Sequence, residues 1–182
     1  DCLGLALDVC NTVAVEAVDG DGGIELAVTG EGEGELPPVR SNRFVAGLED
    51  ALEASIGPRP AAIGWRIVMH NRIPLSRGMG SSSAASVGGV FAGHVLGGRR
   101  LTERQQLQLA TALEGHPDNA AAALLGGFVV SAHLDGRVEA VRFDAPVGLR
   151  AVLFSPDRRL ATADMRRVLP AVVPLRDAVS NM

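Results

Sequence analysis

The chain has 182 residues, 47% of them hydrophobic, which is enough to bury the core of one domain, or of one domain and part of a second. Its formal net charge of −4 and its aromatic content of 3% argue against nucleic-acid binding, which needs a basic surface and stacking side chains. It has neither a long apolar run nor a secretory signal, so the sequence predicts a soluble cytoplasmic protein without a membrane partner.

The first part of the chain predicts two strands, a loop and a helix. Residues 5–18 are rich in alternating β-formers, and a second such run at 24–29 follows Asp-Gly-Asp-Gly-Gly, which predicts a β-hairpin. Residues 31–38 are typical of an exposed, mobile loop. Residues 44–56 have apolar positions at helical spacing, with Ser41 or Asn42 as the expected N-cap.

The middle of the chain alternates between strands and helices. A strand at 65–70 leads into a glycine-rich stretch and then into a helix of small residues at 84–96. Thr102 and Gln105 form a capping-box pattern at the start of a further helix that extends to Leu113. An alanine-rich run ends at Leu125, and strands at 127–133 and 137–143 are expected to pair across Leu-Asp-Gly.

The last part of the chain predicts the start of a second unit. We expect a boundary at 144–148, a new strand at 149–155 and a short helix at 163–169 capped by Thr162. The chain begins without a methionine and ends inside an apparent helix, so we expect it to be part of a longer protein.

The glycine-rich stretch at 72–85 is the first candidate site. It reads Arg-Ile-Pro-Leu-Ser-Arg-Gly-Met-Gly-Ser-Ser-Ser-Ala-Ala, and glycines allow backbone N–H groups to turn inward in front of a helix that begins behind them. The alternative is an ordinary tight turn, but the preceding strand, the three hydroxyls and the small-residue helix favour an anion site. A dinucleotide fingerprint is excluded, because Ser83 stands where its third glycine is due.

The basic residues limit the chemistry of this site. All 17 are arginine, so the chain has no lysine of the Walker, protein-kinase or Schiff-base type. A phosphate bound here must be neutralised by backbone amides, hydroxyls, arginine or a metal ion.

A polar cluster at residues 114–119, Glu-Gly-His-Pro-Asp-Asn, is the second candidate site. A helix end followed by a turn that caps the next helix through Asp118 or Asn119 accounts for part of it, but not for Glu114 and His116 together. The spacing does not fit zinc, whereas Glu114 with a serine hydroxyl suits Mg²⁺. Four further arginines are more typical of a solvated face, although one that points inward could bind a carboxylate: Arg158, Arg159, Arg166 and Arg167.

These motifs together resemble a superfamily of small-molecule kinases. Residues 74–85 resemble the phosphate loop of the galactokinase, homoserine kinase, mevalonate kinase and phosphomevalonate kinase superfamily. Residues 114–119, followed by Leu-Gly-Gly-Phe at 125–128, resemble the homoserine kinases within it, and residues 1–7 resemble the second half of that family's first motif. The resemblance extends along nearly the whole chain.

The resemblance implies an α+β fold with two domains. Residues 1–147 would form an ATP-binding domain like domain 2 of ribosomal protein S5, and residues 148–182 would begin a ferredoxin-like carboxy-terminal domain. The family's first strand and its carboxy-terminal glycine-rich motif have no counterpart in this chain. The implied activity is Mg²⁺- and ATP-dependent phosphorylation of the side-chain hydroxyl of L-homoserine, in threonine biosynthesis, and a homodimer is left open.

The resemblance also implies roles for individual residues. The ATP phosphates would be bound by Pro74, Leu75, Ser76, Arg77, Gly78, Met79, Gly80, Ser81, Ser82, Ser83 and Ala84. The metal would be held by Glu114 with Ser82 or its neighbour Ser81. The substrate would be bound by Asp1, His116, Asn119 and Arg166, with Asp118 and Asn119 as the catalytic residues.

Three alternatives remain open at this point. Asp118 is the candidate general base, but the γ-phosphate itself could accept the proton. The chain could belong to a nucleotide-binding module without catalysis, although such a module does not need Glu114, Asp118 and Asn119. The acceptor could also be another small alcohol such as mevalonate, whereas His116 and Arg166 favour an amino acid.

Overall fold

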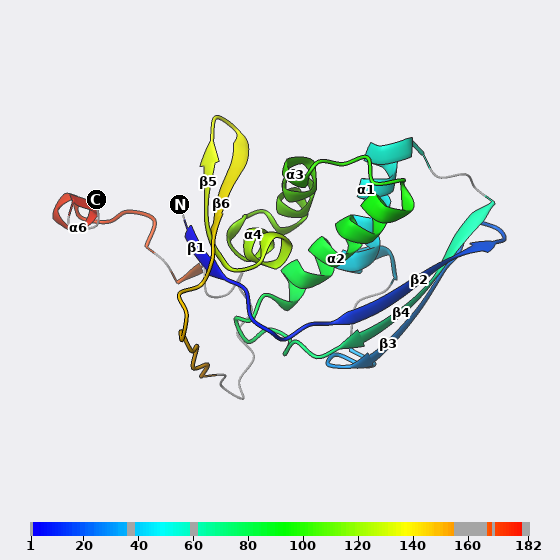
Figure 1. Cartoon of the computed structure of the whole chain (residues 1–182), viewed down its shortest axis with the longest axis horizontal. Coiled ribbons are helices and arrows are strands. Elements are labelled where there is room, and N and C mark those ends of the chain that lie inside the picture. The colour runs from blue at the N-terminus through cyan, green and yellow to red at the C-terminus, as the bar shows by residue number, and fades with distance from the viewer. Residues whose placement is uncertain (1, 36–38, 59–61, 155–166, 169, 180–182) are drawn as a thin grey trace.

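Two three-stranded sheets lie on either side of a group of helices in the computed structural model (Figure 1). The structure describes residues 2–35, 39–58, 62–154, 167–168 and 170–179, and the statements below refer to these. Its elements are β1 (Cys2–Leu5), β2 (Thr12–Asp19), β3 (Ile24–Gly30), η1 (Val39–Ser41), α1 (Arg43–Ile56), β4 (Ile63–Asn71), α2 (Ser81–Leu96), α3 (Glu103–Glu114), α4 (Asp118–Leu125), β5 (Phe128–Leu134), β6 (Arg137–Phe143) and α6 (Leu175–Val179).

The first sheet has the order β2-β4-β3, so the predicted hairpin between residues 5–18 and 24–29 is wrong. The two strands exist, but β4 lies between them, antiparallel to β2 and parallel to β3. Strands on either side of a third are about 10 Å apart, which the four residues between β2 and β3 can span. This link passes the start of β4, where the Trp65 amide donates to the Gly23 carbonyl at 3.0 Å.

An ion-pair ladder crosses the exposed face of this sheet. Arg66 on the central strand donates to Glu25 at 3.0 Å and to Glu16 at 2.9 Å, one on each neighbouring strand. Hydrogen bonding to Glu25 and Glu16 and their negative charges raise the pKa of Arg66. The ladder therefore matches charges across all three strands on the solvent side.

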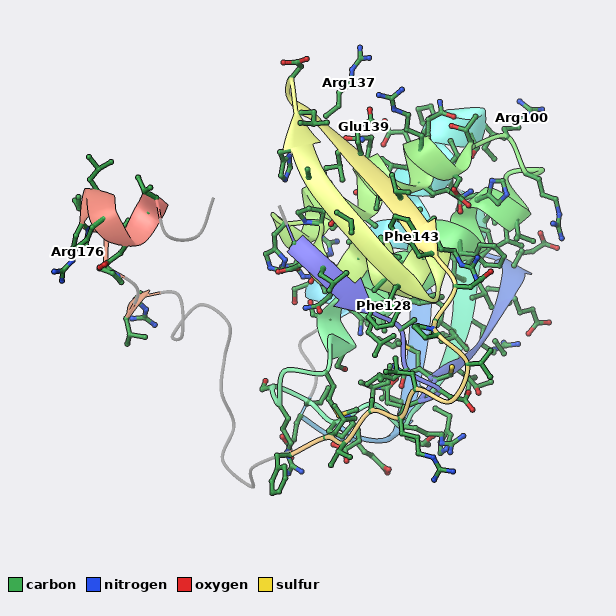
Figure 2. All side chains as sticks on the ribbon, turned by 60° about the vertical axis from the view of Figure 1, so that its left-hand side comes forward. Arg100, Phe128, Arg137, Glu139, Phe143 and Arg176 are labelled. Atoms are coloured by element: carbon green, nitrogen blue, oxygen red, sulfur yellow. The ribbon has the colours of Figure 1, made fainter. Side chains whose placement is uncertain are left out.

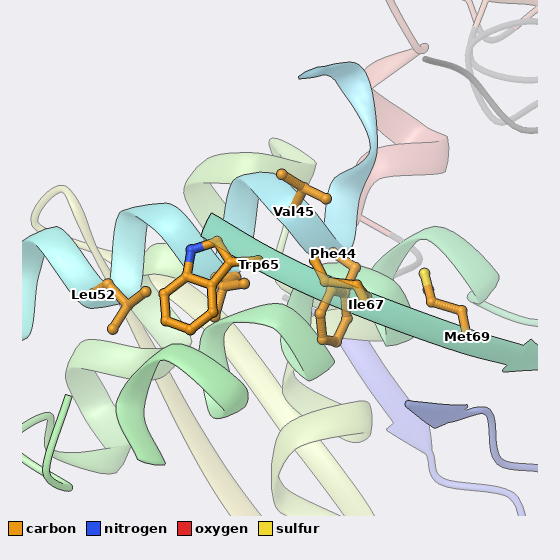
Figure 3. Packing of buried hydrophobic residues seen from close by; sticks show 7 residues of the cluster. Phe44, Val45, Leu52, Trp65, Ile67 and Met69 are labelled. Atoms are coloured by element: carbon orange, nitrogen blue, oxygen red, sulfur yellow. The ribbon is translucent and has the colours of Figure 1, made fainter. Parts of the chain in front are cut away.

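The opposite face of the sheet packs against α1 (Figure 3). As predicted, α1 begins after Asn42, whose side chain accepts hydrogen bonds from the Phe44 and Val45 amides, and it ends at Gly57. The shared core consists of Phe44, Val45, Leu48, Leu52, Trp65, Ile67 and Met69. The helical spacing on α1 and the two-residue alternation on β4 thus meet in one apolar layer.

Helices α1 and α2 are in backbone contact through glycines. A Cβ built on Gly89 would lie 2.9 Å from the Leu48 nitrogen and closer still to the Phe44 carbonyl oxygen. A Cβ on Gly47 would lie 2.5 Å from the Ser86 carbonyl oxygen. The small residues of α2 are therefore required by the close approach of the two helices.

The second sheet has the order β1-β5-β6 and packs against α3 and α4. Figure 2 views these strands from the side opposite the helices, with Phe128 and Phe143 on paired positions of β5 and β6. The predicted hairpin is confirmed: Asp135 and Gly136, both at positive φ, connect its two strands. The predicted capping box of Thr102 and Gln105 also starts α3.

The carboxy-terminal part differs from the prediction. Residues 149–154 form no strand, and they are exposed, with Phe154 at 97%. A strand is stable only with a partner, and no described strand lies beside this segment. The predicted helix at 163–169 and its cap Thr162 fall largely outside the described residues, so the division at residue 147 stays a prediction. Among described residues, no helix is long and apolar enough to cross a membrane.

Candidate functional site

The glycine-rich loop connects the end of β4 to the start of α2. The helix begins at Ser81, three residues earlier than predicted, so the three consecutive serines lie in its first turn. Gly80 precedes it at a φ of 69°, Gly78 has a φ of 75°, and no side chain caps this helix end. The first amides of a 16-residue helix therefore face the loop with their partial positive charge, as an anion site requires.

A side chain from the link between β1 and β2 holds the start of this loop. Asn11 Oδ1 accepts hydrogen bonds from the Arg72 amide at 2.9 Å and from the Ile73 amide at 3.1 Å. One side-chain oxygen thus binds the two residues that leave β4 and enter the loop. Nothing in the sequence indicates this role, because a single asparagine 61 residues before its partner carries no local pattern.

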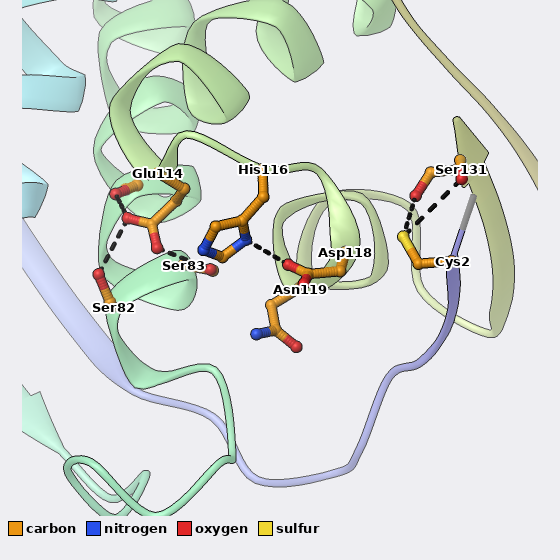
Figure 4. Close-up of polar contacts among 9 residues, drawn as sticks. Cys2, Ser82, Ser83, Glu114, His116, Asp118, Asn119 and Ser131 are labelled. Atoms are coloured by element: carbon orange, nitrogen blue, oxygen red, sulfur yellow. Dashed lines mark hydrogen bonds and ion pairs between the residues drawn. The ribbon is translucent and has the colours of Figure 1, made fainter. Parts of the chain in front are cut away.

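The second cluster meets the loop through Glu114, the last residue of α3 (Figure 4). Its side chain is 5% exposed. Oε1 accepts from the Ser82 hydroxyl at 2.9 Å and the Ser86 hydroxyl at 2.6 Å, and Oε2 accepts from the Ser83 hydroxyl at 2.9 Å. A nearly buried carboxylate is thereby held by three hydroxyls from the first turns of α2.

These donors suit a hard divalent cation that arrives with phosphate ligands. Carboxylate and hydroxyl oxygens are ligands of Mg²⁺, which usually takes one or two carboxylates and completes its shell with phosphate oxygens and water. Among described residues, no group of three or more His, Cys, Asp or Glu side chains could hold a metal alone. The protein therefore offers part of a coordination shell beside its anion site.

His116 and Asp118 form a polar pair at the start of α4. His116 Nδ1 is hydrogen-bonded to Asp118 Oδ1, which also accepts from the Asn119 amide at 2.8 Å (Figure 4). The expected cap position is wrong, because Pro117 is at the N-cap of α4 and makes no side-chain cap hydrogen bond, although Asp118 does accept from a first-turn amide. Asp118 lies in the first turn of α4, where the positive end of the helix dipole stabilises a carboxylate.

Asn119 brings α4 to the glycine loop. A Cβ built on Gly80 would lie 3.3 Å from Asn119 Cβ, so the Asn119 side chain packs directly against the Gly80 backbone. A cavity of about 530 Å³ begins here, and Gly78, Met79, Gly80 and Asn119 contribute to its wall. Its remaining lining comes mainly from apolar residues of the β1–β2 link, α2 and α4. The loop therefore opens onto a pocket large enough for a small molecule.

The structure brings together most of the predicted site. The loop residues 74–84, Glu114 and Asn119 lie around one region, with His116 and Asp118 paired beside it. Asp1 and Arg166 are outside the described residues. Ser83 and Ser86 were not predicted as partners of Glu114; the spacing of Ser82 and Ser86, one helical turn apart, was a signal that could have indicated them.

Known proteins are similar to this chain over much or all of its length. Residues 43–127 match the family described as the GHMP kinases N terminal domain. The homoserine kinase of Corynebacterium efficiens is 46% identical over 189 aligned positions, and that of Corynebacterium glutamicum is 44% identical. Both alignments cover 100% of this chain and 60% of the relative. The crystal structure of homoserine kinase from Cytophaga hutchinsonii matches with a TM-score of 0.76 and 27% identity, over 93% of this chain and 54% of that one.

The fold, the glycine loop in front of α2 and the family match point to one class of protein: residues 43–127 are similar to the amino-terminal domain of the GHMP kinases. Within that class, the curated relatives that align with the whole chain at 44–46% identity are homoserine kinases. The chain spans 60% of the length of these relatives.

Proposed function

We propose that the protein containing this chain transfers the γ-phosphoryl group of ATP to the side-chain hydroxyl of L-homoserine. The proposal is supported by the similarity to homoserine kinases along the whole chain and by the family match. Because the chain spans 60% of those relatives, the activity is proposed for the whole protein.

The observation that carries the proposal is the pairing of Ser82 with Glu114 directly behind the glycine loop. The 2.9 Å hydrogen bond joins the Ser82 hydroxyl, at the start of α2 beside the proposed anion site, to the Glu114 carboxylate at the end of α3. In our proposal, residues 74–84 bind the phosphates of ATP, while Ser82 and Glu114 hold Mg²⁺. The ion, when bound, neutralises charge on the β- and γ-phosphates.

The acceptor would lie on the side of the loop where α4 begins. Asn119 is next to Gly80, and Asp118 is oriented by its hydrogen bond to His116. We assign Asp118 the role of accepting the proton from the substrate hydroxyl, and we assign His116 and Asn119 to the substrate pocket. Asp1 and Arg166 would bind the ammonium and carboxylate groups of the amino acid.

Coupled ADP release by the full-length protein tests the proposal. The assay compares L-homoserine, L-serine, mevalonate and no acceptor at saturating Mg·ATP. We expect release that depends on homoserine, and Glu114→Gln should reduce it strongly because the metal loses its carboxylate. Release that depends on mevalonate would show a kinase for another alcohol. Nucleotide binding without any acceptor-dependent release would indicate a non-catalytic module.

A further inference from the structure

Arg43, the first residue of α1, forms an ion pair with the carboxylate that we assign to the metal. Its Nε lies 3.9 Å from Glu114 Oε1, and its Nη1 donates a hydrogen bond to the Leu113 carbonyl at the end of α3. The Arg43 side chain is 48% exposed, whereas that of Glu114 is 5% exposed. A half-exposed cation therefore lies beside a nearly buried anion.

Arg43 is not needed to fix the position of Glu114. Three serine hydroxyls already bind both carboxylate oxygens at 2.6–2.9 Å. The 3.9 Å separation of Arg43 Nε from the same carboxylate is longer than a hydrogen bond. What Arg43 adds at Glu114 is its positive charge, which balances the carboxylate when no metal ion is bound.

The same charge opposes a divalent cation that approaches Glu114. Arg43 Nε and Ser82 Oγ both lie near Glu114 Oε1, so a metal ion at Ser82 and Glu114 would be close to the guanidinium. A nucleotide changes this balance, because its phosphates supply several negative charges to the metal and to the arginine. Repulsion should therefore be strong for the free ion and weak for the nucleotide complex.

We propose that Arg43 suppresses the binding of a free divalent cation at Glu114 and so makes metal binding depend on the nucleotide. This inference rests on the metal role of Glu114 in the proposed function. It agrees with the partial coordination shell, since no cluster of three or more metal-binding side chains occurs among described residues.

A titration of the full-length protein with Mn²⁺ tests the proposal without an activity assay. Electron paramagnetic resonance measures the concentration of unbound Mn²⁺ at each step. Arg43→Gln removes the charge and keeps a hydrogen-bond donor; Arg43→Lys keeps the charge. Arg104→Gln is the matched control, because Arg104 is similarly exposed, at 52%, and pairs with Glu139 instead. We expect R43Q to bind free Mn²⁺ about tenfold more tightly than the wild type, with R43K and R104Q unchanged.

The titration is repeated with saturating ADP, where we expect the affinity of R43Q for Mn²⁺ to differ from the wild type by less than about threefold. Weaker binding of free Mn²⁺ by R43Q, or an equal gain with and without ADP, would overturn the proposal. Arg43→Met provides a second neutral variant, and thermal unfolding shows that each variant is folded. If Glu114→Gln leaves Mn²⁺ binding with ADP unchanged, the metal assignment itself fails, whatever Arg43 does.

Discussion

Two adjacent glycines of α2 provide a stringent test of how this domain is packed. Gly88 and Gly89 lie in the same helix, so replacing either by alanine brings the same gain in helix propensity, about 0.5–1 kcal/mol. Their surroundings differ. A Cβ on Gly88 would be 3.5 Å from the Phe44 ring, an ordinary contact. A Cβ on Gly89 would be 2.9 Å from the Leu48 nitrogen and closer to the Phe44 carbonyl oxygen, which belong to the rigid backbone of α1.

Gly89→Ala must therefore push α1 and α2 apart, whereas Gly88→Ala need not. Overpacking of this kind costs about 3 kcal/mol, since neither backbone can move without opening the core around Phe44. Less the gain in helix propensity, the net loss is about 2–2.5 kcal/mol. At about 2–4 °C per kcal/mol for a protein of this size, Gly89→Ala should lower the Tm by roughly 4–10 °C. Gly88→Ala should raise it slightly. Thermal unfolding by circular dichroism measures both, and equal Tm values for the two variants would refute the close packing of α1 on α2.

Three further variants test the site and its charges. Asp118→Asn should lower turnover in the ADP-release assay with little change in nucleotide binding; near-normal turnover would rule out Asp118 as the base. Asn11→Leu leaves two loop amides without their acceptor, so it should cost about 1–3 kcal/mol of stability and raise the KM for ATP, whereas Asn11→Asp should keep both. Burial and the charge of Glu53 raise the pKa of Asp50 above its ordinary value of 3.8, so the ionised carboxylate destabilises the fold. Because Asp50 is exposed and solvent screens its charge, Asp50→Asn should add only about 0.3 kcal/mol in urea unfolding at neutral pH. The gain should disappear as the pH falls below 3.8, and a pH-independent difference would contradict it.

Local patterns predicted the elements of this fold better than their arrangement. Asn42, the capping box at Thr102 and the turn at Asp135 act within a few residues, so sequence alone indicated them. The predicted pairing of β2 with β3 was wrong, because the sequence between these two strands does not reveal that β4 lies between them. The residues of β4 that pair with β3 come 41 positions later in the chain. The segment at 149–154 has strand-like residues, but no described strand lies beside it.

The candidate site shows the same limit at the scale of single side chains. The glycine loop and Glu114 were each recognisable, because each has a compact pattern, but the contact between them joins residues 28–32 positions apart. A carboxylate that is 5% exposed needs several donors, and the first turns of α2 supply them from one helix face. Arg43 reaches the same carboxylate from a third helix, so its role depends on how α1 crosses α3. The charge balance of the metal site is therefore a property of the packed helices, and the glycine contacts between α1 and α2 help to set it.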